Sequence, residues 1–394
     1  MRALLLGTTI AIAISASAAA EEVKVGIILG FTGPIESLTP DMANGAELAI
    51  KEINDSGMFL DGTTLVPVRA DSTCTDAAAA SAAAERLVTS DNVVAIMGAD
   101  CSGVTTAVAN NVAVPNGVPI ISPSATSPAL STIDDKDLFF RTAPSDARQG
   151  QVLADVLADR GVKSVAVTYT NNDYGKGFSE AFAAAHKAAG GEITIEAAHE
   201  DGKADYSAEV GALAAAGGDV LVVLGYADQG GLGIIRASLD TGAFDTFAMG
   251  DGMISDSLTE ALGSDLNGSF GTVPWSAGAG SDAFLAAAES GGFDGDGPYR
   301  RESYDAAALI ALAAAKGGKA DRATIAANIL AVANGPGEEI LPGDLAKGLK
   351  ILSEGGEIDY VGATNVELIG PGEASGTYSE HVIEDGAFKS MKLR

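Results

Sequence analysis

Three features of the sequence predict an α/β protein made of two doubly wound lobes. Short β-branched and aliphatic runs alternate with amphipathic helical segments along most of the chain. This alternation is typical of parallel sheets that carry helices on both faces. The alternation falls into two series that meet near residues 139–141. A chain of 394 residues is also too long for one hydrophobic core, and it suits two domains.

The first series of elements occupies the N-terminal part of the chain. A strand is expected at 23–29, then a Gly-rich loop at 30–34 and a helix from about Pro40, with Thr39 as its N-cap. The apolar residues of that helix recur at a helical spacing and share one face. The remaining expected elements are strand 65–70, helix 76–89, strand 93–97, helix 103–112 and strand 118–121.

The second series is expected to repeat the same alternation. Its elements are helix 146–160, strand 164–169, helix 175–189, strand 192–197, helix 206–216, strand 220–224, helix 229–240 and strand 244–249. Two Ala-rich segments at 300–316 and 321–333 follow, and we expect packed helices there rather than low-complexity sequence. Short strands with Gly-rich turns are expected to complete the chain.

The first twenty residues are expected to be a cleavable signal peptide. Met1-Arg2 gives a short positive start, residues 3–14 are apolar, and Ala18-Ala19-Ala20 fits a cleavage site. The apolar stretch is shorter than the roughly 20 residues needed to span a bilayer, and no cysteine that could carry a lipid follows it. We therefore expect export to the periplasm.

The charge of the chain excludes two classes of partner. It carries 24 Lys and Arg residues against 53 Asp and Glu residues, a net charge of −29 that becomes −30 if Arg2 is removed. Nucleic acids and anionic lipid surfaces repel a chain of this charge. We therefore expect neither as a partner, and we interpret the charge as a device for solubility.

The sequence offers little support for catalysis. The histidines are His186, His199 and His381, and their polar surroundings predict surface positions. There is no phosphate-binding Walker run, no Gly-x-Ser-x-Gly elbow and no cluster of cysteine and histidine ligands. We therefore expect no enzymatic activity, no cofactor and no metal site.

Two loops rich in small polar residues point instead to ligand capture. Residues 100–103 follow the expected strand 93–97, and residues 122–128 follow the expected strand 118–121. Each loop places hydroxyls and backbone N–H groups at the carboxyl end of a parallel strand, where open α/β sheets bind ligands. Such groups suit an anionic head such as a carboxylate.

The chain contains two cysteines, Cys74 and Cys101, and in an exported protein an isolated pair indicates a disulfide. Two buried free thiols are the alternative, and a metal site is disfavoured because no histidine lies near either residue. A bridge would stabilise the fold by about 3–4 kcal/mol according to the chain-entropy model. Cys101 belongs to the first polar loop, so the bridge would also brace the expected ligand site.

Several short motifs occur in a characteristic order. They are Gly33-Pro34 with segments 44–46 and 49–54, the cysteine pair, and segments 121–126, 172–177 and 303–306. In these motifs the chain resembles the leucine/isoleucine/valine-binding proteins of bacterial ABC importers, over essentially the whole length after the signal peptide. The resemblance implies a type I periplasmic binding protein, whose two lobes are joined by a three-crossing hinge and close on a ligand.

The resemblance also implies lobe boundaries and partners. Lobe 1 is expected to combine 21–143 with 275–368, and lobe 2 to combine 144–274 with 369–394. The partners implied are a small amino-acid ligand and the membrane permease of an ABC importer, and the protein itself is expected to be a monomer.

The same resemblance assigns residues to the ligand site. Ser102, Ser124 and Thr126 are expected to hold the α-carboxylate of an amino acid. The α-ammonium is expected to contact the segment from Ser124 through Ala125 to Thr126, together with Asp251 of the second lobe. The aromatic residues expected to line the cleft are Tyr174, Tyr226 and Tyr304.

Two positions depart from the pattern of the best-known members. Leu38 stands where some members carry a bulky aromatic residue, and Asp100 stands where an apolar residue precedes the cysteine. Both are expected near the side-chain pocket, and an exposed carboxylate at Asp100 would favour a polar or cationic ligand. The leading expectation is a branched aliphatic amino acid. The alternatives are a polar amino acid, an amide or urea, an aromatic acid, or a ligand-sensing role.

Overall fold

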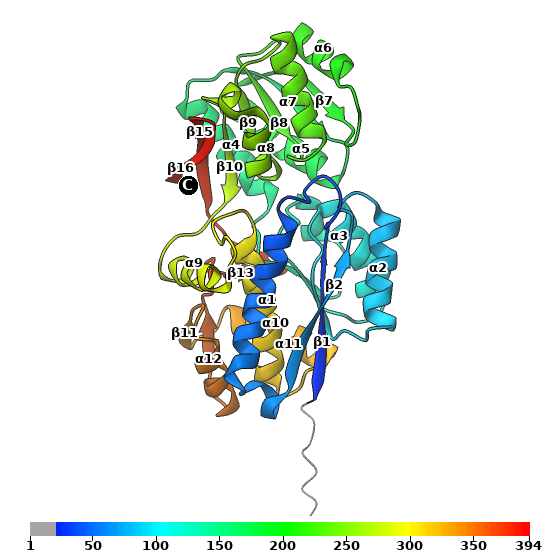
Figure 1. Ribbon diagram of the computed structural model, residues 1–394, viewed down its shortest axis with the longest axis vertical. Helices are drawn as coiled ribbons and strands as arrows, with labels where there is room; N and C mark the ends of the chain where they lie inside the picture. The colour runs from blue at the N-terminus through cyan, green and yellow to red at the C-terminus, as the bar shows by residue number, and fades with distance from the viewer. Residues whose placement is uncertain (1–20) are drawn as a thin grey trace, which may run out of the picture.

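The computed structural model describes residues 21–394, which form two lobes stacked end to end (Figure 1). Each lobe is built on a seven-stranded sheet, so the predicted pair of doubly wound lobes is confirmed. The expected signal peptide at 1–20 lies outside the described residues. Within 21–394, no helix combines the length and the apolar character needed to cross a membrane.

The sheet of the first lobe is parallel except at one edge. Strands β1 to β5 run parallel, and β14 continues the sheet beside β5, while β13 pairs antiparallel with β14. The strand order is β13 (Leu368–Ile369), β14 (Glu373–Ala374), β5 (Phe139–Arg141), β4 (Ile120–Ser122), β3 (Ala95–Gly98), β1 (Glu22–Leu29) and β2 (Thr64–Asp71).

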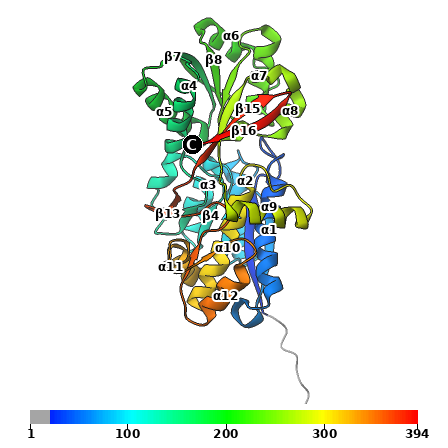
Figure 2. The same ribbon diagram turned by 90° about the vertical axis from the view of Figure 1, so that its left-hand side faces the viewer.

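Helices cover both faces of this sheet. α2 packs against α3 on one side, whereas α1, α11 and α12 pack against the long helix α10 on the other (Figures 1 and 2). Gly45 permits the close approach of α1 to α10, because a Cβ there would lie 2.5 Å from the carbonyl oxygen of Arg300. The helices are α1 (Thr39–Ser56), α2 (Ala77–Thr89), α3 (Ser102–Val108), α9 (Ala279–Gly291), α10 (Arg300–Gly317), α11 (Arg322–Ala333) and α12 (Leu345–Ser353), and the short strands β11 (Glu338–Ile340) and β12 (Ile358–Tyr360) pair beside α12.

The second lobe repeats this plan with an antiparallel edge formed by the C-terminal strands. Its strand order is β16 (Ala387–Leu393), β15 (Tyr378–Glu384), β10 (Phe270–Pro274), β9 (Phe247–Met249), β8 (Val220–Leu224), β6 (Ser164–Thr170) and β7 (Glu192–His199). Its helices are α4 (Asp146–Asp159), α5 (Asp173–Ala188), α6 (Ser207–Ala216), α7 (Gly230–Thr241) and α8 (Asp256–Leu262).

The chain passes between the two sheets three times: after β5, after β10 and after β14. The sequence placed the third crossing at 368–369, but β13 and β14 still belong to the first sheet. The last crossing therefore lies between Ala374 and Tyr378. The Gly370-Pro371-Gly372 segment forms the turn of the edge hairpin between β13 and β14.

Other sequence expectations also need correction. Thr39 is not the N-cap of α1, which follows Leu38, and its hydroxyl donates to the carbonyl of Gly30 at 2.9 Å. Helix α12 occupies a region where only short strands and turns were expected.

The histidines are buried rather than at the surface. His186, His199 and His381 have exposed fractions of 2%, 1% and 6%. His199 Nδ1 lies 2.8 Å from the hydroxyl of Thr168, and burial lowers its pKa to about 4. The prediction relied on the polar residues next to each histidine in the sequence. In β7, however, successive side chains point to opposite faces of the sheet, so His199 is buried beside exposed neighbours. In β15, His381 is buried together with both of its neighbours. His186 lies on the buried face of α5. Within residues 21–394, no group of three or more His, Cys, Asp or Glu side chains could hold a metal ion.

Candidate functional site

A small cavity, of about 20 Å³, lies between the lobes, at the carboxyl ends of the parallel strands of both sheets. The loops after β3 and β4 reach it from the first lobe, and the segments after β6, β8 and β9 reach it from the second. This is the edge at which open α/β sheets bind ligands. The residues that line it are Ile35, Leu38, Asp100, Cys101, Ser102, Ser124, Tyr174, Tyr226, Asp251, Gly252 and Tyr299.

Contacts across the cleft hold the lobes together around this cavity. Asp228 of the second lobe accepts a hydrogen bond from the Ser37 N–H at 2.9 Å, and its own N–H donates to the carbonyl of Pro34 at 3.1 Å. On the other side of the cleft, the Ser127 hydroxyl donates to the carbonyl of Asp173 at 3.0 Å. The molecule is therefore in its closed arrangement.

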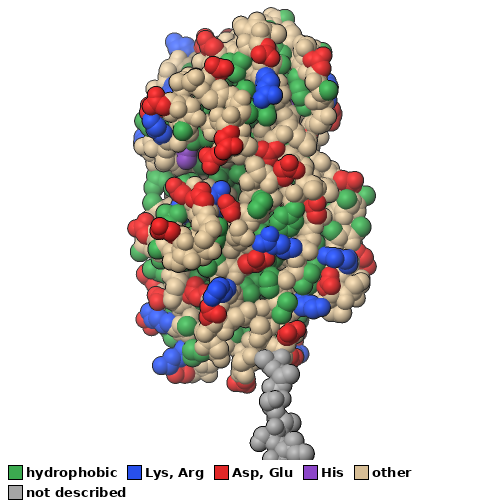
Figure 3. Space-filling model, viewed as in Figure 1, with side chains coloured by type: hydrophobic (Ala, Val, Ile, Leu, Met, Phe, Trp, Pro, Cys, Tyr) green, Lys and Arg blue, Asp and Glu red, His purple; other side chains and the backbone are tan. Residues whose placement is uncertain are grey.

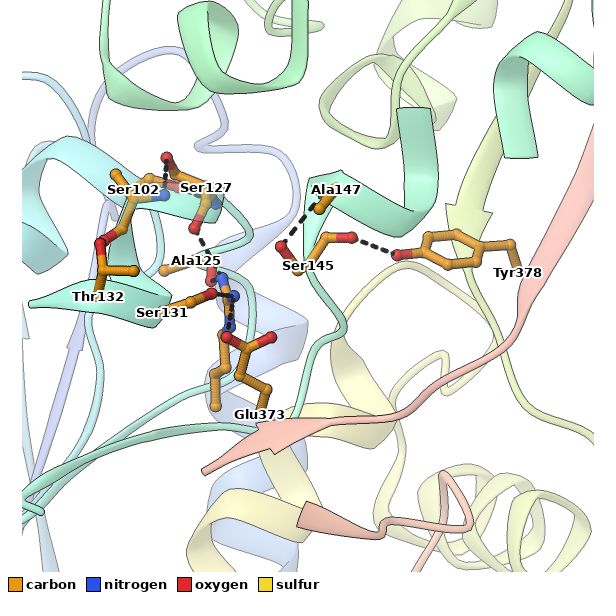
Figure 4. Close-up of polar contacts among 11 residues, drawn as sticks. Ser102, Ala125, Ser127, Ser131, Thr132, Ser145, Ala147, Glu373 and Tyr378 are labelled. Atoms are coloured by element: carbon orange, nitrogen blue, oxygen red, sulfur yellow. Dashed lines mark hydrogen bonds and ion pairs between the residues drawn. The ribbon is translucent and has the colours of Figure 1, made fainter. Parts of the chain in front are cut away.

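Of the first-lobe residues expected at the site, Ser102 and Ser124 line the cavity, whereas Ala125 and Thr126 do not. Ser102 Oγ accepts a hydrogen bond from the Ser127 N–H at 3.1 Å, so its own proton remains available to another acceptor (Figure 4). The Ser124 hydroxyl donates to the carbonyl of Asp100 at 3.1 Å. Thr126 Oγ1 is buried and has no hydrogen-bond partner within residues 21–394.

Arg141, at the end of β5, stabilises the loop that follows β4 by hydrogen bonds to its backbone carbonyls. Its Nη1 donates to the carbonyls of Ala125 at 3.0 Å and Ser127 at 2.9 Å. Its Nη2 donates to Ser131 Oγ at 2.9 Å and lies 3.3 Å from a carboxylate oxygen of Glu373 (Figure 4). Most N–H groups of the loop are also bonded within the protein: those of Ser124 and Ala125 donate to Ser122 Oγ, at 3.4 and 2.9 Å, and that of Ser127 donates to Ser102 Oγ.

Asp251 supplies a negative charge on the second-lobe side of the cavity. Its Oδ1 accepts a hydrogen bond from the Tyr174 hydroxyl at 2.9 Å, and its Oδ2 accepts one from the Tyr299 hydroxyl. Burial raises the pKa of Asp251, although these two tyrosines favour the ionised form. The carboxylate is therefore fixed in position, and a cationic ligand group beside it would keep it charged.

A second buried carboxylate, Asp146, was missed by the sequence reasoning. It lies in the first turn of α4, its side chain is 0% exposed, and neither carboxylate oxygen has a hydrogen-bond partner within residues 21–394. Burial, followed by repulsion from Asp251, raises its pKa well above the usual range, although the nearby Thr126 hydroxyl and the Arg141 guanidinium favour the ionised form. In the sequence, Ser145-Asp146 resembles an ordinary helix start, so nothing there distinguished it.

Asp100 lines the cavity, but its charge is already used within the protein. Its carboxylate is buried and accepts hydrogen bonds from the Gly30 N–H at 2.5 Å and from Ser72 Oγ at 2.8 Å. Asp100 therefore links the loop that follows β1, at Gly30, to the loop that follows β2, at Ser72. A polar or cationic ligand, which an open Asp100 carboxylate would have favoured, gains no support.

Tyr304 does not line the cavity, and this part of the expected site is wrong. It is fully buried in α10, where its hydroxyl donates to Glu52 of α1 at 2.5 Å. Tyr299 takes the place expected of it, since it precedes α10 with a φ of 64° and reaches Asp251. The helical turns between the two tyrosines direct Tyr304 toward α1 instead of the cleft.

The disulfide between Cys74 and Cys101 is present, with an S–S distance of 2.03 Å. Cys101 lines the cavity between Asp100 and Ser102. The bridge therefore braces the loop that presents Ser102, as the sequence suggested.

The sequence and the fold of the chain are similar to those of known proteins. Residues 22–337 match the family model described as periplasmic binding protein. The chain belongs to the periplasmic binding protein family. Among its relatives is a Leu/Ile/Val-binding protein homolog of Brucella melitensis, 33% identical over 65% of this chain and 68% of the relative.

Two further comparisons extend the similarity over most of the molecule. The leucine-, isoleucine-, valine-, threonine- and alanine-binding protein of Pseudomonas aeruginosa is 29% identical over 79% of this chain and 83% of its own length. The crystal structure of a leucine-binding protein from Thermotoga maritima superimposes with a TM-score of 0.80 at 22% identity, covering 94% of this chain and 98% of that one. This binding protein thus has the type I fold implied by the sequence.

Proposed function

We propose that this protein is the substrate-binding component of an ABC importer and captures a branched aliphatic α-amino acid between its lobes. The observation that carries the proposal is the distribution of polar groups around the cavity. Ser102 and Ser124 line it from the first lobe and Asp251 lines it from the second. Asp146 does not line the cavity, but it lies near enough to Asp251 for the two charges to repel each other. The names of the relatives agree with such a ligand.

The head group of a zwitterion suits these two sets of groups. The free proton of Ser102 is a donor for the α-carboxylate. Thr126 does not line the cavity, and its hydroxyl lies close enough to Asp146 to favour the ionised form of that carboxyl. Asp251, with Asp146 close by, offers a buried counter-charge to the α-ammonium. Charge-assisted hydrogen bonds of this kind are about twice as strong as neutral ones, particularly where water is excluded.

The rest of the cavity suits an aliphatic side chain. Its other walls are formed by Ile35, Leu38, the disulfide at Cys101 and the stacked rings of Tyr174 and Tyr226. Since the Asp100 carboxylate is occupied by Gly30 and Ser72, these walls offer no counter-charge to a cationic side chain. A ligand without an amine, such as an aromatic acid or an amide, would leave the buried Asp251 without a cation.

Calorimetry with analogues of leucine tests the proposal. Leucine, isoleucine and valine are expected to bind, and at 100 times its dissociation constant a ligand stabilises the fold by about 2.7 kcal/mol. Two matched controls, 4-methylpentanoate and 3-methylbutylamine, each lack one charged group and are expected to bind far more weakly. Binding of 4-methylpentanoate as tight as that of leucine, or the failure of every aliphatic amino acid to bind, would refute the assignment.

Export to the periplasm and delivery to a membrane permease belong to the same proposal. Cleavage after Ala20 is expected, so that the exported protein begins at Glu21. N-terminal sequencing of protein recovered from the periplasm tests this directly. The intact chain, recovered only from the cytoplasm, would contradict it.

A further inference from the structure

The carboxylate of Asp251 is hydrogen-bonded from both lobes. Its Oδ1 accepts from the hydroxyl of Tyr174, a residue of its own lobe, at 2.9 Å, and the Tyr174 oxygen accepts in turn from the Gly252 N–H at 3.2 Å. Its Oδ2 accepts from the hydroxyl of Tyr299, which belongs to the first lobe. The bond from Tyr174 does not depend on closure, because both residues move with the second lobe. The bond from Tyr299 crosses the cleft and requires the closed arrangement.

This cross-cleft bond is shielded from water. In the space-filling view the two lobes meet along the waist of the molecule (Figure 3). Asp251 and Tyr299 are buried, with exposed fractions of 3% and 4%. Hydrogen bonds to an ionised acceptor are about twice as strong as neutral ones, and they are stronger inside a protein than in water. The bond is therefore able to favour closure of the lobes.

The backbone at Tyr299 is held in a conformation that brings its ring to the cleft. Its φ of 64° lies in the left-handed region, which is unfavourable for a residue with a Cβ. The Tyr299 carbonyl accepts from the Ser303 N–H at 3.0 Å and from the Ser303 hydroxyl at 2.7 Å. The next residue, Arg300, pairs with Asp41 at 3.5 Å and with Asp294 at 2.5 Å. Residues held in this way cluster at ligand clamps, which points to a role for the Tyr299 side chain.

The Tyr299 hydroxyl is a donor at ordinary pH. Burial, followed by the charge of Asp251, raises the pKa of this hydroxyl well above its usual value, so it keeps its proton. A ligand ammonium beside Asp251 would keep that carboxylate ionised, and an ionised acceptor strengthens the bond. The bond across the cleft is therefore strongest when a cationic group is bound.

We propose that Tyr299 is a positioning residue that couples the charge of Asp251 to closure of the lobes. In the closed arrangement its hydroxyl fixes the Asp251 oxygen that Tyr174 does not contact. A bound ammonium keeps the carboxylate ionised, strengthens the bond across the cleft and slows reopening. The link to amino-acid binding rests on the proposed function, whereas the contribution of Tyr299 to closure does not.

Closure can be measured without a ligand by cross-linking the lobes. Ser37 Oγ of the first lobe and Ser255 Oγ of the second lie 3.0 Å apart. In a Ser37→Cys, Ser255→Cys variant, sulfur atoms at these places are within reach of a disulfide, and its rate of formation in oxidised glutathione reports the closed population. Cys74 and Cys101 do not interfere, because they are bonded to each other. Intact mass after alkylation at timed intervals follows the reaction.

Adding Tyr299→Phe to this variant removes one hydroxyl and keeps the ring. Cross-linking should slow by about three- to tenfold, because the closed arrangement loses a bond that the open one does not make. Tyr360→Phe is the matched control. Tyr360 is also buried and donates to a buried carboxylate, that of Asp305 at 2.8 Å, but both residues belong to the first lobe. The control should lose stability and keep its rate of cross-linking.

Asp251→Asn tests whether Tyr299 acts through the carboxylate. In this background Tyr299→Phe should slow cross-linking much less, because the acceptor is no longer ionised. Three results would overturn the proposal: unchanged cross-linking in Tyr299→Phe, equal slowing in Tyr360→Phe, or the same slowing with and without Asp251→Asn.

Stopped-flow release of leucine tests the link to the ligand. Tyr299→Phe should release leucine about three- to tenfold faster than wild type, and Tyr360→Phe should release it at the wild-type rate. Unchanged release in Tyr299→Phe would refute the coupling. If leucine does not bind at all, the proposed function fails, and cross-linking still decides whether Tyr299 favours closure.

Discussion

At the scale of single residues, Asp251 is the group on which ligand binding most depends. Asp251→Asn keeps the shape of the side chain but replaces one of the two oxygens that accept from Tyr174 and Tyr299 by an NH2 group, and it removes the charge opposite the ligand ammonium. We expect leucine binding to weaken by about 2–4 kcal/mol, because a buried ammonium would lose its counter-charge. Calorimetry measures the change. Asp245→Asn, at an exposed position, is the control, and equal affinities in the two variants would contradict the role of Asp251.

Asp146 predicts how binding depends on pH. Its pKa in the empty cleft is raised well above the usual range, so the carboxyl holds its proton to a higher pH than an ordinary aspartate. An incoming ammonium favours the ionised form, and leucine binding should therefore release protons and weaken as the pH falls. Calorimetry in buffers of different ionisation enthalpy measures this release. Asp146→Asn should reduce it, and a dissociation constant that is flat between about pH 5 and 8 would argue against the model.

The sequence identified part of this site. The hydroxyls of Ser102 and Ser124 were predictable because each follows an apolar strand, whose end lies at the binding edge of the sheet. Asp146 and Tyr299 were not, because their roles depend on how the lobes close. The direction in which Tyr304 points is set by packing between α1 and α10, which the sequence pattern does not reveal.

At the scale of elements, Arg141 joins the end of β5 to the ligand loop. Arg141→Met should leave the carbonyls of Ala125 and Ser127 without their donor, destabilising the fold and weakening leucine binding by at least about 1.4 kcal/mol, or tenfold. Arg322→Met is a matched control, because Arg322 likewise donates to backbone carbonyls, those of Val88, Val93 and Asn116, far from the cleft. The control should lose stability but keep its affinity. Loss of stability alone in Arg141→Met would assign Arg141 a purely structural role.

Helix α10 contains a carboxyl group that makes stability depend on pH. Burial raises the pKa of Glu302 to about 8. The pKa of Glu302 is higher in the folded protein than in the unfolded chain. The contribution of this group to the free energy of unfolding is therefore present at low pH and is lost as the pH rises toward 8. The slope is at most about 1.4 kcal/mol per pH unit. Urea unfolding of wild type and Glu302→Gln should show that the variant gains stability relative to wild type on going from pH 5 to 8, and parallel pH profiles would contradict this.

Element prediction succeeded where the local pattern was strong. The strand expected at 220–224 is β8, and the amphipathic helix expected at 146–160 is α4 to within one residue. Near the C-terminus, where glycines are closely spaced, short strands were expected and the β13–β14 hairpin is present, but α12 was missed and the first lobe was ended too early, at 368. Glycine signals a turn, but it does not reveal whether the chain then leaves the lobe or returns to the same sheet.

At the scale of the whole molecule, Asp228 links the lobes when they are closed. Its side chain accepts hydrogen bonds from the Ser37 N–H of the first lobe and from the Ser257 hydroxyl of its own lobe. Asp228→Ala should favour the open arrangement and weaken leucine binding about three- to tenfold, mainly through faster release. Stopped-flow dissociation and small-angle scattering with and without leucine measure both effects. Asp240→Ala, outside the lobe contacts, is the control, and identical release rates would exclude Asp228 from closure.

The three crossings have a consequence for how the protein can be made. Neither lobe is a continuous stretch of sequence. The sheet of the first lobe is completed by β13 and β14, and the sheet of the second lobe is completed by β15 and β16, which are the last strands of the chain. No single cut of the gene therefore yields two fragments that each contain a whole lobe. During synthesis, both sheets remain incomplete until nearly the entire chain has emerged, so maturation is delayed to the end. This order of assembly is compatible with the export proposed above, in which the chain would cross a membrane before it folds.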